Sequence, residues 1–197
     1  MGDGSDQGGL CAGEQIMSAL IGRPDSQVIR TFFPEFYRMV YHTPSGLDDI
    51  LLTSDGTAIT GLRFLQNGAQ SPVSEEQVPV FEEAARWLDD YFAGHPGSTL
   101  PKIRIEELTP FRKEVLSRLM EIPYGETVTY GEIAQEIAQK RSTTGRMSAQ
   151  AVGGAVGWNP ICIMIPCHRV IGADGSLTGY GGGIENKRWL LVHEGIL

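Results

Sequence analysis

Apolar and polar residues alternate in the first hundred positions as they do in short β-strands. Residues 36–43 (FYRMVYHT) show this alternation, and residues 51–65 show it on both sides of Asp55-Gly56, a dipeptide typical of hairpin turns. From residue 80 to residue 92 the apolar positions instead recur at helical spacing, and Gly94 is expected to end that helix. The pattern predicts a small strand-rich domain covered by one helix.

Helical spacing returns three times in the second half of the chain. A threonine N-cap followed by proline predicts a helix over residues 109–119, and the capping box TYGE predicts one over residues 129–138. Residues 148–157 (SAQAVGGAVG) predict a third, short helix. Two short helices in succession indicate a helix-turn-helix, with the basic loop 140–146 as an enlarged turn. The apolar stretch Ile161–Ile165 predicts a short buried strand.

The size and composition of the chain are those of a globular protein with one large or two small domains. Its 197 residues carry a net charge of −8, with 5 basic and 14 acidic side chains in residues 1–100 against 11 and 10 in residues 101–197. The C-terminal half is therefore the part expected to bind phosphate, through few contacts. No apolar run approaches the roughly 20 residues of a membrane span. Three cysteines without an export signal favour the reducing cytoplasm, and since nothing indicates oligomerisation, a monomer is expected.

The strongest chemical motif is IPCHRVIG (residues 165–172), which places a cysteine between a proline and a histidine. A thiol is a useful nucleophile only as its thiolate, and a neighbouring imidazole is a common way to form one. Cys167 and His168 are therefore candidate catalytic residues, the alternative being that Cys167 is only a buried thiol. Cys162, in the apolar run ICIMI, is expected to pack in the core. These three residues lack the paired spacing and the fourth ligand of a zinc site, so no metal is predicted.

Four segments follow one another in the order found in a known family: IPYGETVTYGEIA, AQAVGGAVGWNP, IPCHRVIG and GYGGGIENKRWLLVHEG. Over residues 109–195 the chain resembles the O6-alkylguanine-DNA alkyltransferases, also called methylated-DNA–protein-cysteine methyltransferases. The resemblance implies an α/β (α+β) fold, with a small strand-rich, ribonuclease-H-like N-terminal domain and a C-terminal winged helix-turn-helix-like catalytic domain. We expect a flexible N-terminal extension (1–33), an N-terminal α/β domain (34–104) and a C-terminal DNA-binding and alkyl-acceptor domain (105–197).

The resemblance implies DNA repair by direct, cofactor-free and irreversible transfer of an alkyl group from O6-alkylguanine, with O4-alkylthymine as a second candidate substrate. It places the acceptor at Cys167, with His168 taking its proton through a water and Glu194 orienting His168. Tyr130 matches the family tyrosine that donates a hydrogen bond to the guanine ring as charge develops there. Asn159 matches the asparagine that ties the helix-turn-helix to the active-site turn. The product is a thioether, which water does not readily cleave, so each molecule is expected to act once.

The target atom lies inside a duplex, so the resemblance also implies that the nucleotide is flipped into a protein pocket. Gln150 stands where the family often has an arginine that fills the gap left by the flipped base, and a glutamine carries no charge and less stacking surface. Lys140, Arg141 and Arg146 of the basic loop are a hypothetical source of compensating phosphate contacts. The expected partner is DNA containing alkylated guanine, and neither a membrane nor a metal. The residues expected to contact DNA or the base are Tyr130, Arg146, Gln150, Ala151, Gly153, Arg169, Val170 and Tyr180.

Three other functions remain open on the sequence alone. A protein that recognises alkylated guanine without repairing it would lack the acceptor cysteine, whereas this chain has Cys167. A winged-helix regulator of this family would carry a further domain with more cysteines. A Cys-His hydrolase would need an oxyanion hole and would turn over repeatedly. Repair is therefore the favoured interpretation.

Overall fold

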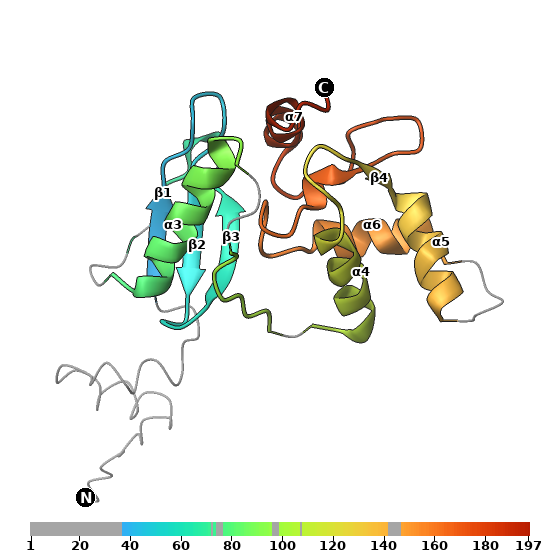
Figure 1. The fold of residues 1–197 in the computed structure, drawn as a ribbon, viewed down its shortest axis with the longest axis horizontal. Helices are drawn as coiled ribbons and strands as arrows, with labels where there is room; N and C mark the ends of the chain where they lie inside the picture. Colours follow the sequence, from blue (N-terminus) through green and yellow to red (C-terminus); the bar gives the residue numbers. More distant parts are fainter. Residues whose placement is uncertain (1–36, 72, 74–76, 96–98, 107, 142–146) are drawn as a thin grey trace, which may run out of the picture. The chain divides into compact units, whose positions relative to one another are not determined.

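The computed structural model describes residues 37–71, 73, 77–95, 99–106, 108–141 and 147–197. The predicted N-terminal extension, residues 1–33, lies outside the described residues, and so does Arg146. The described residues belong to one unit, whose ribbon is drawn in Figure 1.

The predicted strands form an antiparallel sheet in the order β1-β2-β3. They are β1 (Tyr37–Tyr41), β2 (Ile50–Ser54) and β3 (Ile59–Phe64). The hairpin turn is confirmed, because Gly56 has a φ of 95° and the Asp55 carboxylate accepts hydrogen bonds from two backbone N–H groups of the turn. Leu52 and Leu62 pair across β2 and β3 and are fully buried, which places the core on that face of the sheet.

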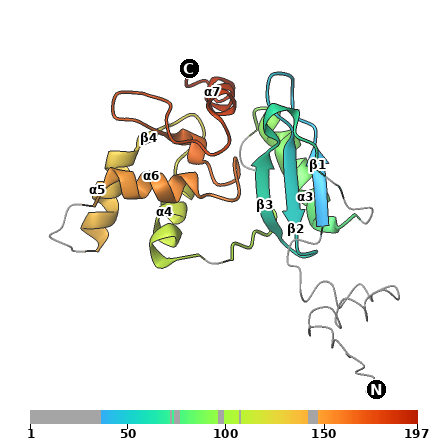
Figure 2. The same cartoon turned by 180° about the vertical axis from the view of Figure 1, so that it is seen from behind.

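Helix α3 (Pro79–Phe92) covers one face of this sheet, and Figure 2 shows the sheet from the opposite side. Of the seven apolar positions that the spacing predicted, the helix buries Val80, Phe81, Ala84, Leu88 and Tyr91, whereas Ala85 and Phe92 are only partly buried. Gly94, with a φ of 78°, follows its C-terminus as expected. A short 3-10 helix, η1 (Gln66–Gly68), precedes it in the sequence. The strand-rich first domain with its covering helix is therefore confirmed.

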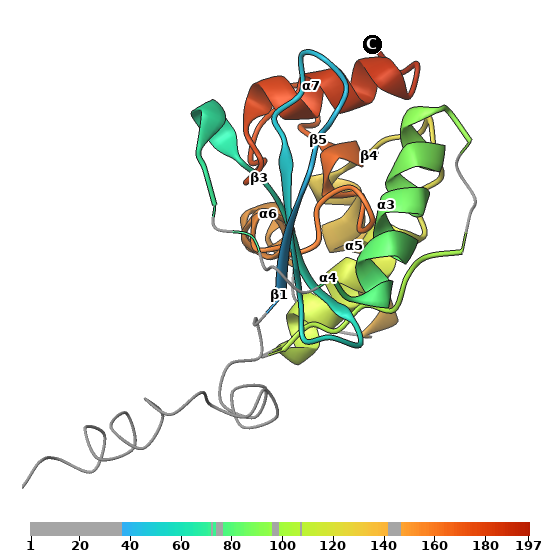
Figure 3. The same cartoon turned by 90° about the vertical axis from the view of Figure 1, so that its left-hand side faces the viewer.

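The C-terminal half begins with three helices that pack against one another (Figure 3). They are α4 (Pro110–Met120), α5 (Tyr130–Lys140) and α6 (Ala149–Gly157). Thr109 caps α4 by accepting from the Arg112 N–H, and Thr129 and Glu132 form the predicted capping box of α5. The successive helices α5 and α6 are in contact, as expected for a helix-turn-helix.

Small elements surround the turn that carries Cys167. Strands β4 (Val128–Thr129) and β5 (Val170–Ile171) pair in parallel, and the 3-10 helix η2 (Cys167–Arg169) lies directly before β5. Helix α7 (Ile184–His193) contacts η2. None of the helices in the described part of the chain is long and apolar enough to cross a bilayer.

The apolar stretch Ile161–Ile165 is not the buried strand that its composition predicted. Only Ile161 forms a bridge, with Leu62 of β3, and the chain then turns through Ile163, whose φ is 65°. A β-branched residue is strained in this left-handed region, and the packed core around it holds it there. The prediction was wrong because a buried turn and a buried strand have the same apolar composition.

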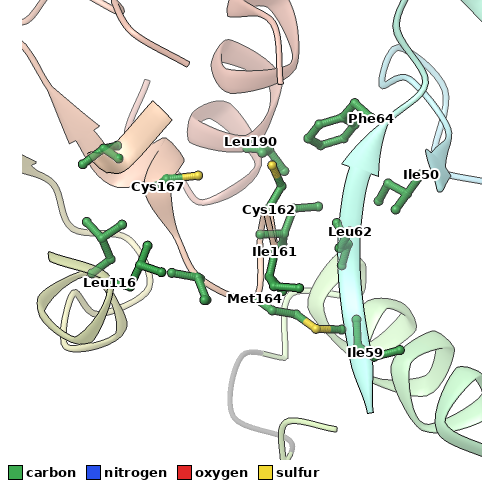
Figure 4. Close-up of a cluster of buried hydrophobic side chains, with 14 of the residues drawn as sticks. Ile50, Ile59, Leu62, Phe64, Leu116, Ile161, Cys162, Met164, Cys167 and Leu190 are labelled. Carbon is green, nitrogen blue, oxygen red and sulfur yellow. The ribbon is translucent and has the colours of Figure 1, made fainter. Parts of the chain in front are cut away.

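The edge of β3 holds the start of this turn. The Leu62 N–H donates to the Pro160 carbonyl at 2.9 Å, and the Leu62 carbonyl accepts from the Cys162 N–H at 3.0 Å. Figure 4 shows Leu62 and Phe64 of β3 beside Cys162, with Cys167 in the same buried cluster. The N-terminal sheet therefore helps to position the segment that leads to Cys167.

Candidate active site

Cys167 lies at the first position of η2, and an asparagine holds its thiol. Asn159, just after α6, donates from Nδ2 to Cys167 Sγ at 3.0 Å and to the Ile165 carbonyl at 2.8 Å. Its Oδ1 accepts from the Ile161 N–H at 3.1 Å. Asn159 and Cys167 are both buried, so these bonds fix the sulfur relative to the helix-turn-helix.

The surroundings of Cys167 favour its thiolate. The hydrogen bond from the Cys162 thiol lowers the pKa of Cys167, and burial opposes this without reversing it. Asn159 and the nearby Lys187 ammonium lower that pKa further. Cys162, whose own pKa is raised by the same contact, packs in the core as predicted. It is therefore both a core residue and a neighbour of the candidate nucleophile.

His168 is a fully buried imidazole that faces a carboxylate. Its Nε2 lies 2.7 Å from Glu194 Oε1, and neither side chain is exposed. Burial lowers the pKa of His168 despite this partner, so the ring is neutral at pH 7. Because an ionised carboxylate only accepts, Nε2 carries the proton and Nδ1 carries the lone pair. This Nδ1 has no hydrogen-bond partner among the described residues.

Glu194, directly after α7, is a buried anion with several donors. Burial would raise its pKa, but hydrogen bonds from His168 and Arg169 lower it to about 2. Arg169 donates to it from Nε at 2.8 Å and from Nη2 at 3.0 Å, while Nη1 reaches the Ile122 carbonyl. Arg169 was expected to contact DNA, and in this structure its guanidinium bonds to groups within the protein. Its guanidinium is buried because it compensates the buried carboxylate.

Tyr130 begins α5, and its hydroxyl is already engaged. It donates to the Thr178 carbonyl at 2.8 Å, and the same carbonyl accepts from Lys187 Nζ at 3.1 Å. Burial, together with the charge of Cys167, raises the pKa of Tyr130, so its hydroxyl stays protonated at neutral pH. Lys187 Nζ also donates to the Val170 carbonyl at 2.6 Å, and burial lowers the pKa of Lys187 to about 8.

A cavity of about 380 Å³ lies beside Cys167, a volume within the range of small-molecule sites. Gly182, on one of its walls, has no room for a side chain, because a Cβ would lie 2.6 Å from Tyr180 and 2.7 Å from Phe64. Tyr180 is buried, and burial together with the two thiols raises its pKa. The cavity is lined by Arg63, Phe64, Val156, Gly157, Trp158, Asn159, Pro160, Cys162, Cys167, Gly181 and Gly182.

The first turns of α6 are open to solvent. Gln150 and Ala151 are exposed, as a role in contacting DNA requires. A Cβ on Gly154 would meet nothing within 4 Å, and one on Gly153 would meet only the Tyr130 ring at 3.9 Å. Internal packing does not demand these glycines, although each destabilises a helix by about 0.5–1 kcal/mol relative to alanine. Their absent side chains leave the helix backbone open to a partner outside the protein.

Part of the basic loop serves the packing of the helices. Arg141 donates to both carboxylate oxygens of Glu114, at 2.9 and 3.0 Å, and its guanidinium lies over the Phe111 ring. It thereby ties the end of α5 to α4. Lys140 is the other residue of the proposed phosphate-binding set that the structure describes, because Arg146 lies outside the described residues.

In the described part of the chain, no three His, Cys, Asp or Glu side chains lie close enough together to hold a metal ion. His42 contacts one carboxylate, that of Asp49, at 2.8 Å. Since structural zinc takes four ligands, this pair alone does not make a zinc site.

Three groups at the site were not identified from the sequence. Tyr91 of α3 donates to Glu194 Oε1 at 2.7 Å, the Gly125 N–H donates to Glu194 Oε2 at 3.2 Å, and Lys187 adds a buried positive charge. Tyr91 was recognisable only as one apolar position of a helix. Lys187 did leave a signal, since it stands three and four residues before two buried leucines and thus on the buried face of α7.

Two family models match the chain. The ribonuclease-like domain of 6-O-methylguanine DNA methyltransferase matches residues 36–100, and the DNA binding domain of the same family matches residues 110–196. The methylated-DNA–protein-cysteine methyltransferase of Methanosarcina acetivorans is 42% identical over 162 residues, which cover 81% of this chain and 98% of that protein. The corresponding protein of Haemophilus influenzae is 40% identical over 163 residues, which cover 80% of this chain and 87% of that protein.

Solved structures agree with the fold. A crystal structure of Mycobacterium tuberculosis O6-methylguanine methyltransferase is 38% identical, has a TM-score of 0.65 and covers 80% of this chain and 92% of that chain. The Mycobacterium tuberculosis OGT in complex with DNA is 39% identical, has a TM-score of 0.66 and the same coverage. These likenesses confirm the predicted α/β fold with an N-terminal domain and a C-terminal DNA-binding domain. The chain belongs to the methylated-DNA–protein-cysteine methyltransferase family.

Proposed function

We propose that this protein repairs DNA by transferring an alkyl group from O6-alkylguanine directly to Cys167, once per molecule and as a monomer. The observation that carries the proposal is a buried thiol bonded to Asn159, next in sequence to an imidazole whose Nε2 faces Glu194. An imidazole with an available lone pair can take a thiol proton, and a carboxylate stabilises the cation that results. Family membership supports the substrate class, with O4-alkylthymine as a further candidate.

The reaction begins with the loss of the Cys167 proton. Nδ1 of His168 is the proposed acceptor, reached through a water, and the imidazolium is then paired with Glu194. The pKa of about 2 keeps Glu194 ionised at neutral pH. The thiolate attacks the alkyl carbon, so a carbon–sulfur bond forms while the carbon–oxygen bond breaks, and the electron pair stays on the base. Because water does not readily cleave the thioether, the protein is consumed.

Tyr130 is the proposed donor to the base as negative charge develops there. In the free protein its hydroxyl donates to the Thr178 carbonyl, so it has to turn to a new acceptor. That carbonyl still accepts from Lys187 Nζ, so the exchange does not leave it without a donor. Lys187 thus makes it easier for Tyr130 to change partners.

The target oxygen lies within the base stack, so the nucleotide has to flip out, which costs a few kcal/mol. The cavity beside Cys167 is the proposed place for the base, although Val170 and Tyr180, which are also expected to contact the base, are not among the residues that line it. The exposed start of α6, with Gln150 and Ala151, is the proposed DNA-facing surface, together with the backbone at Gly153. This role is supported by the absence of any internal packing reason for the glycines of α6.

The basic loop is proposed to contact phosphate groups. Replacing Lys140, Arg141 and Arg146 together by Ala should weaken DNA binding at low salt. The variant would neutralise fewer phosphates, so its binding would release fewer counterions from the DNA. Glu114→Ala is the matched control, since it breaks the ion pair with Arg141 without removing a positive charge. Unchanged DNA affinity in the triple variant would dispose of this part of the proposal.

The decisive test is chemical. The protein is mixed with an oligonucleotide that carries one 6-O-methylguanine, and the masses of its cysteine peptides are mapped. Cys162 and Cys167 share one peptide after cleavage at Arg146 and Arg169, so we expect one added methyl group on that peptide, assigned to Cys167 and not to Cys162 by fragmentation, and a yield that stops at one per protein. A Cys167→Ser variant should leave the lesion intact.

The other outcomes contradict repair. Tight binding of an intact lesion would indicate recognition alone, and turnover beyond one equivalent would indicate a conventional enzyme. Removal of the lesion by Cys167→Ser at the native rate would exclude Cys167 as the acceptor.

A further inference from the structure

The oxygen of Glu194 that faces His168 also accepts a hydrogen bond from the N-terminal domain. Tyr91, near the end of α3, is only 2% exposed, and its hydroxyl donates to Glu194 Oε1 at 2.7 Å. His168 Nε2 lies 2.7 Å from the same oxygen, and Arg169 Nη2 lies 3.0 Å from it. One oxygen thus collects three donors, and one of them belongs to a residue 103 positions earlier in the chain.

The other oxygen of Glu194 is also occupied. Oε2 accepts from Arg169 Nε at 2.8 Å and from the Gly125 N–H at 3.2 Å. A carboxylate offers about four lone-pair positions, so this set of donors fills it and favours a single orientation. The orientation of Glu194, and with it the tautomer and direction of the His168 ring, is therefore set jointly by α3, η2 and the turn at Gly125.

Neighbouring aromatic rings hold Tyr91 in place. Its ring stacks on Trp87 with the centroids 5.6 Å apart, and it meets Tyr124 edge to face at 6.0 Å. The Tyr91 carbonyl lies 2.9 Å from His193 Nε2. Burial, and then the charge of Glu194, raises the pKa of Tyr91, so its hydroxyl stays protonated and donates to the carboxylate.

We propose that Tyr91 is a positioning residue for alkyl transfer, whose hydroxyl holds Glu194 so that His168 directs Nδ1 toward the proton of Cys167. The inference rests on the proposed function and adds a residue from outside the C-terminal half to it. Helix α3 then has two roles, because it covers the sheet and it also fixes the carboxylate on which the base depends. A C-terminal half alone would lack this donor.

Loss of the hydroxyl should change the titration of His168 as well as its position. The positive end of the O–H dipole lies at Oε1, beside the imidazole, and disfavours the imidazolium. Removing this dipole therefore raises the pKa of His168. Among the described residues, the titratable and charged groups around the His168–Glu194 pair are Tyr91 from α3, Tyr124 from the turn before β4, Arg169 from η2 and Lys187 from α7, and His193 of α7 contacts the Tyr91 ring.

The test compares the full-length protein with Tyr91→Phe and with a matched control, Tyr41→Phe. Tyr41 also lies in the N-terminal domain, and its hydroxyl also donates to a carboxylate, that of Asp89, at 2.7 Å. A single-turnover reaction with the methylated oligonucleotide gives the transfer rate, and binding to the unmethylated oligonucleotide gives the Kd. We expect Tyr91→Phe to slow transfer about tenfold, the size of one hydrogen bond to a charged group, with the Kd unchanged within about twofold. The control should keep the native rate.

Two further readouts separate positioning from a general loss of structure. A nitrogen NMR titration of the His168 ring should show the Nε2–H tautomer in the native protein and the control, and a raised pKa in Tyr91→Phe. In a Glu194→Gln background, Tyr91→Phe should cause no further slowing, because its hydroxyl acts through that carboxylate.

Transfer by Tyr91→Phe at the rate of the control would overturn the inference. Equal slowing by Tyr91→Phe in the native and the Glu194→Gln backgrounds would also overturn it. A native protein that leaves Cys167 unmethylated is a separate result, since it would refute the proposed function itself.

Discussion

The most direct physical test of the site is the replacement Glu194→Gln, which removes one buried charge and keeps the shape of the side chain. The carboxylate is fully buried and is bonded to His168 and to Arg169. The amide cannot accept from all of these donors, and it leaves the Arg169 guanidinium buried without a counter-charge. Both effects should destabilise the fold at neutral pH and abolish the orientation of His168.

The magnitude follows from the pKa of Glu194, which falls from an ordinary value of 4.5 to about 2 on folding. One pKa unit corresponds to about 1.4 kcal/mol, so the ionised carboxylate stabilises the fold by about 3 kcal/mol at pH 7. Because the folded pKa is depressed, this stabilisation is present above the unfolded pKa and is lost as the pH falls through the folded one. At pH 3.5 about 2 kcal/mol should remain, and near pH 1 almost none.

The assay is urea unfolding of the native protein and of Glu194→Gln at pH 7, 5 and 3.5. The difference in unfolding free energy should be largest at pH 7 and should shrink below pH 5. Burial also lowers the pKa of His168, so both proteins lose stability in acid because this imidazole gains a proton on unfolding. This loss largely cancels when the unfolding free energies of the two proteins are subtracted. Glu114→Gln is the control, because Glu114 is also bonded to an arginine but is exposed.

The reasoning would be refuted if Glu194→Gln lowered the unfolding free energy at pH 7 no more than Glu114→Gln does. It would also be refuted if the difference in unfolding free energy between the native protein and Glu194→Gln stayed constant from pH 7 to pH 3.5. Either result would mean that the carboxylate is not the ionised, fully bonded group on which the orientation of His168 depends.

Three further changes test other parts of the site. Cys162→Ala removes the largest influence that lowers the pKa of Cys167, so the reaction of Cys167 with iodoacetamide should slow at neutral pH and its pH profile should move upward. Gly154→Ala should raise the unfolding free energy by about 0.5–1 kcal/mol, measured by urea unfolding, and should weaken DNA binding because its methyl group projects where nothing in the protein stands. Gln150→Arg should tighten binding to duplex DNA by up to about tenfold at low salt, measured as a Kd, and should leave the reaction with single-stranded substrate unchanged.

The elements of the fold were largely predictable because their patterns are local. A few neighbouring residues determine each of these features: the capping box at Thr129, the hairpin at Asp55-Gly56 and the apolar face of α3. The turn through Ile163 was not predictable, since only the core around it and the edge of β3 make its positive φ tolerable. Local sequence carries no record of such long-range constraints.

In the site, too, some residues could be predicted from local sequence and others depend on contacts between distant segments. Cys167 and His168 were recognisable from a short motif, whereas Asn159, which the structure bonds to the thiol, was indicated only by the family resemblance. Tyr91 was not, because its apolar ring satisfies the helical pattern and hides the role of its hydroxyl. The bonds of Arg169 to Glu194 could not be predicted either, because only the fold brings that carboxylate next to it.

The burial of an ion pair beside Cys167 is itself an argument about function. Breaking a buried pair is costly, but replacing the whole pair by apolar residues of similar volume is often neutral or stabilising. Stability alone therefore gives this chain little reason to bury Glu194 with Arg169 and His168. A proton acceptor that must stay neutral and fixed in direction until a thiol loses its proton does require such a cluster. Donors from α3, η2 and the turn at Gly125 bind one carboxylate, and they thereby fix the group on which the orientation of the His168 imidazole depends.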